Sequence, residues 1–164
     1  MPPLKRLERH SSEQPNSRNR RDLSAFMSHR ILSLDHGTVR IGVAISDDML
    51  MIAQPEPFVP ADPPEAIETY IHQRWEGQLK LILVGMPRNM DGSYGPAAEK
   101  VKAFVQRLQE KTDVPIRTWD ERLTSAQANR VMIEADVRRD KRKQKVDSMS
   151  AAILLQSYLD AGLG

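Results

Sequence analysis

Three carboxylates at the ends of predicted secondary-structure elements are the residues of this 164-residue chain best placed to do chemistry. Asp35 ends an apolar strand, Glu121 follows a second strand, and Asp147 opens the last helical segment. A buried carboxylate is costly unless a cation or hydrogen bonds compensate its charge. Because carboxylate oxygens are good ligands for hard cations, the three acids together predict a site for Mg²⁺ or Mn²⁺, with two ions held between them.

Each acid taken alone can also be explained as a helix cap, a turn residue or one half of a salt bridge. The coincidence of three acids at element ends favours the metal site, because the C-terminal ends of parallel strands meet at one edge of a sheet. Asp35 and Glu121 should lie two strands apart, a gap of roughly 10 Å for strands spaced about 4.8 Å apart. Two metal ions about 4 Å apart can bridge such a gap.

The elements that must position these acids follow from the apolar patterning, which predicts five strands. They are expected at residues 31–35, 40–46, 51–59, 79–84 and 114–118. The segment 79–84 is almost continuously apolar, as in a central parallel strand, whereas the prolines of 51–59 suit an edge strand or a loop.

Helical spacing predicts four helices between and after the strands. They are expected over 62–77 with Asp62 as the cap, from Pro96, after Thr124, and over 146–159. The order of elements predicts an α/β fold with a mixed five-stranded sheet, in which three antiparallel strands are followed by parallel ones and helices cover both faces.

The segment 40–46 has one bulky face and one bare face. Ile41, Val43 and Ile45 alternate with Gly42 and Ala44. We expect another element to approach the bare face closely, because nothing larger than a methyl group projects from it.

Composition limits the domain organisation and the classes of chemistry. Residues 1–28 are polar, basic and without periodicity, which predicts a disordered N-terminal extension, and residues 29–164 form the single expected domain. The absence of cysteine excludes disulfides, thiolate zinc sites and cysteine nucleophiles, and it suits a cytoplasmic location. No apolar run approaches the roughly 18 residues that span a bilayer, so no membrane partner is expected.

Basic residues gather close to the third acid. Residues 138–145 contain six Lys or Arg side chains directly before Asp147. Such a stripe fits an anionic polymer, although a solvated linker would have the same composition. The glycine-rich segment 85–95 lacks the ending of a Walker A loop, which leaves a long turn or a contact with a phosphate backbone as its two explanations.

Four motifs, taken together, resemble the YqgF/RuvX family. Its members are described as Holliday-junction-resolvase-like proteins and as nucleases of precursor 16S rRNA, with an RNase H-like fold. The resemblance runs from Ile31 to Tyr158 and rests on Asp35-x-Gly37-x-x-Arg40-Ile41-Gly42-Val43-Ala44, Val84-Gly85-Met86-Pro87-x-Asn89-Met90-Asp91-Gly92-Ser93, Asp120-Glu121-Arg122-Leu123-Thr124 and Asp147-x-x-x-Ala151-Ala152-x-x-Leu155-Gln156.

The resemblance implies that Asp35, Glu121 and Asp147 are catalytic acids that hold the metal ions. Asp120 and Glu121 should point to opposite faces of their strand, and the family pattern favours Glu121 as the ligand. We expect substrate contacts from five polar side chains near the motifs, which are Thr38, Arg40, Asn89, Arg122 and Lys145.

The expected function is that of a metal-dependent nuclease, a hydrolase of phosphodiester bonds that processes the 5′ end of precursor 16S rRNA during ribosome biogenesis. Its partner would be structured RNA, and it would act in the cytoplasm as a monomer or weak homodimer. One alternative is a Holliday junction resolvase that cleaves branched DNA with the same chemistry. Another is a non-catalytic RNA-binding factor of ribosome assembly or transcription that keeps the fold.

Overall fold

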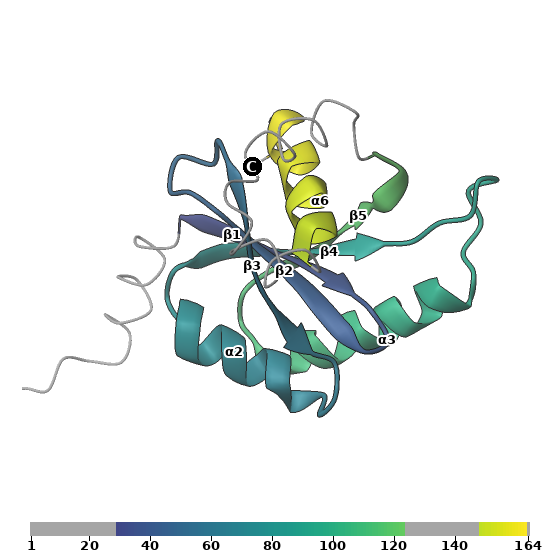
Figure 1. The fold of residues 1–164 in the computed structure, drawn as a ribbon, viewed down its shortest axis with the longest axis horizontal. Helices are drawn as coiled ribbons and strands as arrows, with labels where there is room; N and C mark the ends of the chain where they lie inside the picture. Colours follow the sequence, from purple (N-terminus) through teal and green to yellow (C-terminus); the bar gives the residue numbers. More distant parts are fainter. Residues whose placement is uncertain (1–28, 124–147, 164) are drawn as a thin grey trace, which may run out of the picture.

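The computed structural model describes residues 29–123 and 148–163 (Figure 1). Several predictions fall on segments outside these described residues. They are the disordered extension 1–28, the helix after Thr124, the basic run 138–145 with Lys145, and Asp147.

The described residues form a mixed five-stranded sheet with the strand order β3-β2-β1-β4-β5. The strands are β1 (Arg30–His36), β2 (Arg40–Ser46), β3 (Ala53–Pro60), β4 (Leu79–Met86) and β5 (Ile116–Asp120). β1 pairs antiparallel with β2, and β2 pairs antiparallel with β3, whereas β4 runs parallel to both β1 and β5. The predicted α/β fold and the five predicted strands are therefore confirmed, with β4 in the interior of the sheet and β3 and β5 at its edges.

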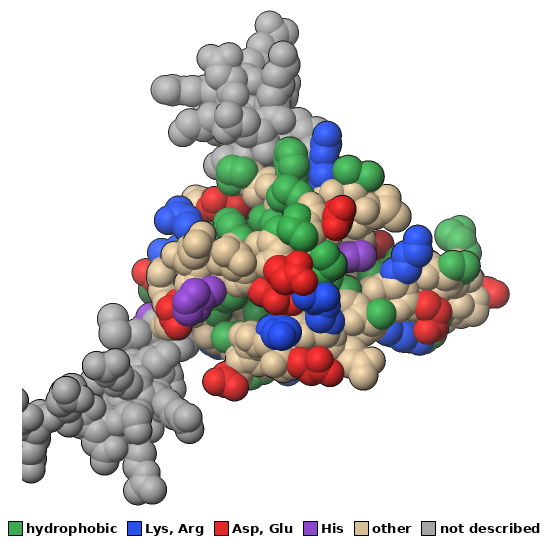
Figure 2. All heavy atoms as spheres, turned by 90° about the horizontal axis from the view of Figure 1, so that it is seen from below, with side chains coloured by type: hydrophobic (Ala, Val, Ile, Leu, Met, Phe, Trp, Pro, Cys, Tyr) green, Lys and Arg blue, Asp and Glu red, His purple; other side chains and the backbone are tan. Residues whose placement is uncertain are grey.

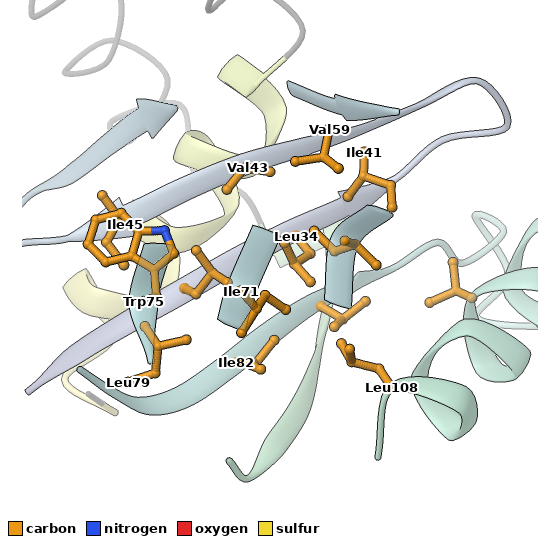
Figure 3. Close-up of a cluster of buried hydrophobic side chains, with 14 of the residues drawn as sticks. Leu34, Ile41, Val43, Ile45, Val59, Ile71, Trp75, Leu79, Ile82 and Leu108 are labelled. Atoms are coloured by element: carbon orange, nitrogen blue, oxygen red, sulfur yellow. The ribbon is translucent and has the colours of Figure 1, made fainter. Parts of the chain in front are cut away.

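Helices cover both faces of this sheet, as predicted (Figure 1). α2 (Glu65–Trp75) and α3 (Pro96–Lys111) pack on one face and α6 (Met149–Asp160) packs on the other. Figure 3 shows the larger apolar core, between the sheet and the α2–α3 layer. No helix in the described ranges combines the length and apolar character needed to cross a membrane.

The charges on the α2–α3 face are mixed in sign. Figure 2 shows acidic side chains beside basic ones on the view from below. Arg107 of α3 contacts two acids of α2, with its Nε 2.9 Å from Glu68 Oε1 and its Nη2 3.2 Å from Glu65 Oε1. Arg107 therefore bridges the two helices of this face.

The two sides of β2 divide between the two cores as the sequence predicts. Ile41, Val43 and Ile45 belong to the core under α2 and α3, and Ala44 belongs to the core under α6. There Ala44 shares a cluster with Ala151 and Ala152 of α6. Small side chains on both elements let α6 lie close to the sheet, because only methyl groups separate the two backbones.

Two details of the predicted helices are wrong. The N-cap of α2 is Pro64 and makes no side-chain cap hydrogen bond, so Asp62 does not cap the helix. The reason is that the two prolines lie before the first turn and place Asp62 two residues ahead of the cap position. α6 begins at Met149, with Ser148 as its N-cap, rather than at Val146.

Candidate active site

Asp35 lies at the C-terminal end of β1, on the face of the sheet that α6 covers. Alternation along β1 places it on the same side as Ile31, which belongs to the α6 core. Its carboxylate lines a hollow of about 250 Å³, and the other walls come from Glu121, Ser150, Ile153 and Leu154. One side of the hollow is thus an acid pair and the other is the N-terminal half of α6.

Glu121 reaches Asp35 across the intervening strand. β5 ends at Asp120, and Glu121 is the first residue of a short 3₁₀ helix, η1 (Glu121–Leu123). β4 separates β5 from β1, yet the side chains of Glu121 and Asp35 are joined by a hydrogen bond. The structure thus brings these two predicted acids into direct contact, although their strands are not neighbours.

The environment of Glu121 changes its protonation. Burial, followed by the negative charge of Asp35 and the hydrogen bond with it, raises the pKa of Glu121 from 4.5 to about 7. Asp120 adds a smaller repulsion in the same direction. At neutral pH a substantial fraction of Glu121 is therefore protonated, which lets the two acids remain in contact.

Asp120 points elsewhere, as the alternation along β5 predicts. Its Oδ2 lies 2.8 Å from Nη2 of Arg122 and 3.9 Å from Nη1 of Arg88. The hydrogen bond from Arg122 lowers the pKa of Asp120, so this acid is ionised at a pH where Glu121 is partly protonated. Of the two neighbouring acids, the structure brings Glu121 to Asp35.

Two of the predicted substrate-binding residues line a second hollow beside Asp35. Thr38 and Arg40, from the β1–β2 turn and the start of β2, line an open hollow that also includes Asp35. The guanidinium of Arg40 lies 4.7 Å from the centre of the Phe58 ring on β3. Asp35 therefore lies between two hollows, one walled by α6 and one walled by the β1–β2 turn.

Asn89 and Arg122 lie where the loop between β4 and α3 contacts η1. Asn89 belongs to the long loop between β4 and α3, which extends away from the sheet in Figure 1. Its side-chain Nδ2 donates to Ser93 Oγ at 3.0 Å, and its backbone carbonyl accepts a long hydrogen bond of 3.5 Å from Arg122 Nη1. The loop and η1 are thereby connected beside the acid pair.

Several contributors to this region are not predicted from the sequence. Arg88 lies 4.4 Å from the centre of the Tyr94 ring and also reaches Asp120, and Ser150 and Ile153 of α6 line the hollow. Arg88 could have been noticed as a cation inside the glycine-rich motif. Nothing local in the sequence marks Ser150 or Ile153, because they join the site through the packing of α6.

The third predicted acid, Asp147, and Lys145 lie outside the described residues. The residue that follows Asp147 is Ser148, which is buried and whose Oγ accepts a 3.0 Å hydrogen bond from the Val43 amide. Val43 is adjacent to Gly42, the partner of Asp35 in the β1–β2 ladder. Within residues 29–123 and 148–163 no three His, Cys, Asp or Glu side chains cluster as metal ligands, so a third acidic ligand would have to come from elsewhere.

The sheet order and the two helical layers define an RNase H-like fold. A solved structure of similar fold is T. thermophilus RuvC in complex with Holliday junction substrate, with a TM-score of 0.51 over 82% of this chain and 96% of that chain. The two sequences are 13% identical, so the likeness concerns the fold alone.

The sequence comparisons define the family. The family model RuvX, described as Holliday junction resolvase, matches residues 29–161, and the chain belongs to this family. A relative from Halothermothrix orenii is 48% identical over 80% of this chain and 94% of its own length. Another from Desulforamulus reducens is 46% identical over 81% of this chain and 98% of its own. Both relatives carry the name "Putative pre-16S rRNA nuclease". The predicted family resemblance is confirmed.

Proposed function

We propose that this protein is a nuclease that uses divalent metal ions to hydrolyse phosphodiester bonds, and that its substrate is precursor 16S rRNA. The observation that carries the proposal is the contact between Asp35 and Glu121, two acids from strands that are not neighbours. Membership of the RuvX family and the names of the relatives support the choice of chemistry and of substrate.

The acid pair fits a hard divalent cation such as Mg²⁺ or Mn²⁺. Its donors are carboxylate oxygens, and the raised pKa of Glu121 shows that the pair does not readily carry two negative charges by itself. Asp35, Glu121 and Asp147 would hold the ions. When bound, such ions lower the pKa of a water molecule and offset the charge that develops on the phosphate.

The protein's own side chains would hold and orient the substrate around this pair. Thr38 and Arg40 line a hollow with Asp35, and Arg122, which follows Glu121 in η1, contacts Asn89. We propose Thr38, Arg40, Asn89, Arg122 and Lys145 as contacts to the substrate. Ile153 and Leu154 border the acids with apolar surface, which limits the water around the pair.

A Holliday junction resolvase is the second candidate. The family description and the fold shared with a RuvC bound to a Holliday junction favour it. Both candidates use the same acids, so they differ in which nucleic acid binds with its scissile phosphate at Asp35.

The experiment that tests the proposal compares the two substrates directly. The purified full-length chain is incubated with end-labelled precursor 16S rRNA and with a labelled four-way DNA junction, each with Mg²⁺, with Mn²⁺ and with EDTA. We expect cleavage of the RNA that depends on the metal ion, with the junction left intact. Cleavage of the junction alone would establish the resolvase, and RNA binding without any cleavage would establish a non-catalytic RNA-binding factor.

We further propose that the protein acts in the cytoplasm, where precursor rRNA of a bacterial type is made and matured, and that it is a monomer or a weak homodimer. Light scattering coupled to size-exclusion chromatography at several concentrations measures the oligomeric state. A single tight dimer at all concentrations would contradict this assignment.

A further inference from the structure

The path of the Glu121 side chain toward Asp35 passes over Gly85 of β4. In the sheet, Gly85 pairs with Trp119 of β5, and its preceding residue Val84 pairs with Leu34, the residue before Asp35. Gly85 is therefore the point of β4 that lies between the two acids. Leu83, two residues earlier, belongs to the α6 core, so position 85 faces the same side as the acid pair.

A side chain at position 85 would occupy the place of the Glu121 carboxyl group. A Cβ built on Gly85 would lie 2.9 Å from Oε1 of Glu121 and 3.3 Å from its Cγ. The first distance is shorter than real Cβ atoms show, so Glu121 would have to move. The carboxyl group of Glu121 thus lies in the space that any other amino acid at this position would fill.

The backbone conformation gives no other reason for glycine at this position. Within the described residues the glycines with positive φ are Gly77, Gly92 and Gly162, and Gly85 is not among them. A glycine inside a strand ordinarily weakens the strand, because it packs nothing against the neighbouring layers. The feature that requires glycine at position 85 is therefore close approach of another group.

We propose that Gly85 is a positioning residue of the acid site: its missing side chain forms the passage through which Glu121 crosses β4 and meets Asp35. On this proposal the separation of the two carboxyl groups, and with it the affinity for a divalent ion, depends on position 85. The part that concerns the metal ion rests on the proposed function, whereas the contact between Gly85 and Glu121 does not.

The competing explanation is packing against α6. The same Cβ would lie 3.2 Å from Cδ2 of Leu154, which is also tight. If this contact is the reason for glycine, then shortening Leu154 relieves the strain of Gly85→Ala and shortening Glu121 does not. The two explanations therefore predict different double variants to be stable.

A cycle of thermal unfolding measurements in EDTA separates the two explanations without any metal ion. We expect Gly85→Ala to lower Tm by about 3–10 °C, as overpacked sites do. In the Glu121→Ala background Gly85→Ala should lower Tm much less, because the Glu121 carboxyl group no longer occupies the space above position 85. If Gly85→Ala alone does not fold, a folded Gly85→Ala/Glu121→Ala protein supports the proposal equally. Recovery with Leu154→Val but not with Glu121→Ala would overturn it.

Binding of Mn²⁺ alone, measured by titration calorimetry on the metal-free protein, tests the consequence for the site. We expect Gly85→Ala/Leu154→Val, which keeps Glu121 but displaces it, to bind Mn²⁺ about tenfold or more weakly than the Leu154→Val parent. Gly95→Ala is the matched control, because a Cβ there meets only Asn89, at an ordinary distance of 3.5 Å. This control should bind Mn²⁺ as the wild type does.

The unfolding cycle and the Mn²⁺ titration can contradict the positioning role of Gly85 and the proposed function independently of each other. Unchanged Mn²⁺ affinity in Gly85→Ala/Leu154→Val, with wild-type binding intact, would overturn the positioning role. Absence of Mn²⁺ binding by the wild type would instead contradict the proposed metal-dependent function. The unfolding cycle would still decide whether Glu121 needs the space above Gly85.

Discussion

Because Glu121 contacts Asp35, protonation of the Glu121 side chain should change the stability of the whole protein. The pKa of Glu121 in the folded protein is about 7, against an ordinary value of 4.5. Between these two pH values the native state binds more protons than the unfolded state, so the free energy of unfolding falls as pH rises and levels off above pH 7.

The first prediction concerns this pH window in metal-free protein. Measured in EDTA, the Tm of the wild type should fall between pH 4.5 and 7 relative to that of Glu121→Gln, which cannot titrate at this position. Above pH 7 the variant should be the more stable of the two, because it no longer places a second negative charge against Asp35. Parallel Tm profiles for the two proteins would show that Glu121 titrates normally.

A second prediction separates catalysis from binding at Asp35. Asp35→Asn keeps the shape of the side chain but removes a charge from the acid pair, so cleavage of precursor rRNA should fall by about 10²-fold or more. Its affinity for the RNA should stay close to that of the wild type, because the acids contribute no attraction to phosphate. Asp113→Asn, an exposed acid before β5, is the control and should cleave normally. Cleavage by Asp35→Asn at the wild-type rate would exclude the nuclease mechanism.

A third prediction compares the neighbouring acids of β5 and η1. Glu121→Gln should lose metal-dependent cleavage, whereas Asp120→Asn should lose less, because Asp120 contacts Arg122 and Arg88 instead of Asp35. Titration of cleavage with Mn²⁺ for both variants checks this difference. An inactive Asp120→Asn beside an active Glu121→Gln would mean that the ligand is Asp120.

At the scale of elements, the start of α6 is fixed to the sheet by one hydroxyl group. Ser148 is buried and its Oγ accepts the hydrogen bond of the Val43 amide. The β2–β3 register is irregular between Ile41 and Val43, where such an amide needs a partner outside the ladder. The N-cap residue of α6, Ser148, therefore gives the Val43 amide a hydrogen-bond partner at the irregular point of β2.

The fourth prediction follows from this hydrogen bond. Ser148→Ala should lower the free energy of unfolding by about 1–3 kcal/mol, the usual cost of leaving a buried amide without a partner. Ser150→Ala, two residues later and exposed, should change it by less than about 0.5 kcal/mol. Urea unfolding of both variants is the measurement, and equal effects would refute the anchoring role of Ser148.

The elements differ in how well the sequence predicts them. The alternation of Ile41, Val43 and Ile45 with smaller residues correctly predicts both faces of β2, because burial acts on each position separately. The cap of α2 was mispredicted at Asp62, since the exact start of a helix depends on backbone angles that the two prolines impose. The sequence predicts Glu121 as a site residue but not its route over Gly85, because that route depends on three strands at once.

At the scale of the whole molecule, the distribution of charge bears on where nucleic acid binds. The α2–α3 face mixes acids and bases (Figure 2), and the clearest cationic run in the chain, residues 138–145, precedes Asp147 in the sequence. Its structure lies outside the described residues, so its part in binding remains a prediction from the sequence.

The fifth prediction tests that run. Replacing Arg142, Lys143 and Lys145 by Ala should weaken binding to RNA for all sequences alike and flatten the log–log salt dependence by nearly one unit for each residue replaced. The control replaces the exposed Lys80 and Lys111, which lie at the N-terminal end of β4 and the C-terminal end of α3. An unchanged salt slope in the triple variant would mean that the run is a solvated linker.

Because α6 forms one wall of the hollow around Asp35 and Glu121, the stage of chain synthesis also matters for this site. Ser150, Ile153 and Leu154 come from the last helix, and the hydrogen bond that fixes this helix joins residues 105 positions apart. A nascent chain that has emerged only as far as η1 already contains Asp35 and Glu121 but lacks this wall. The wall of the hollow around the acids can therefore be completed only after the ribosome has made α6.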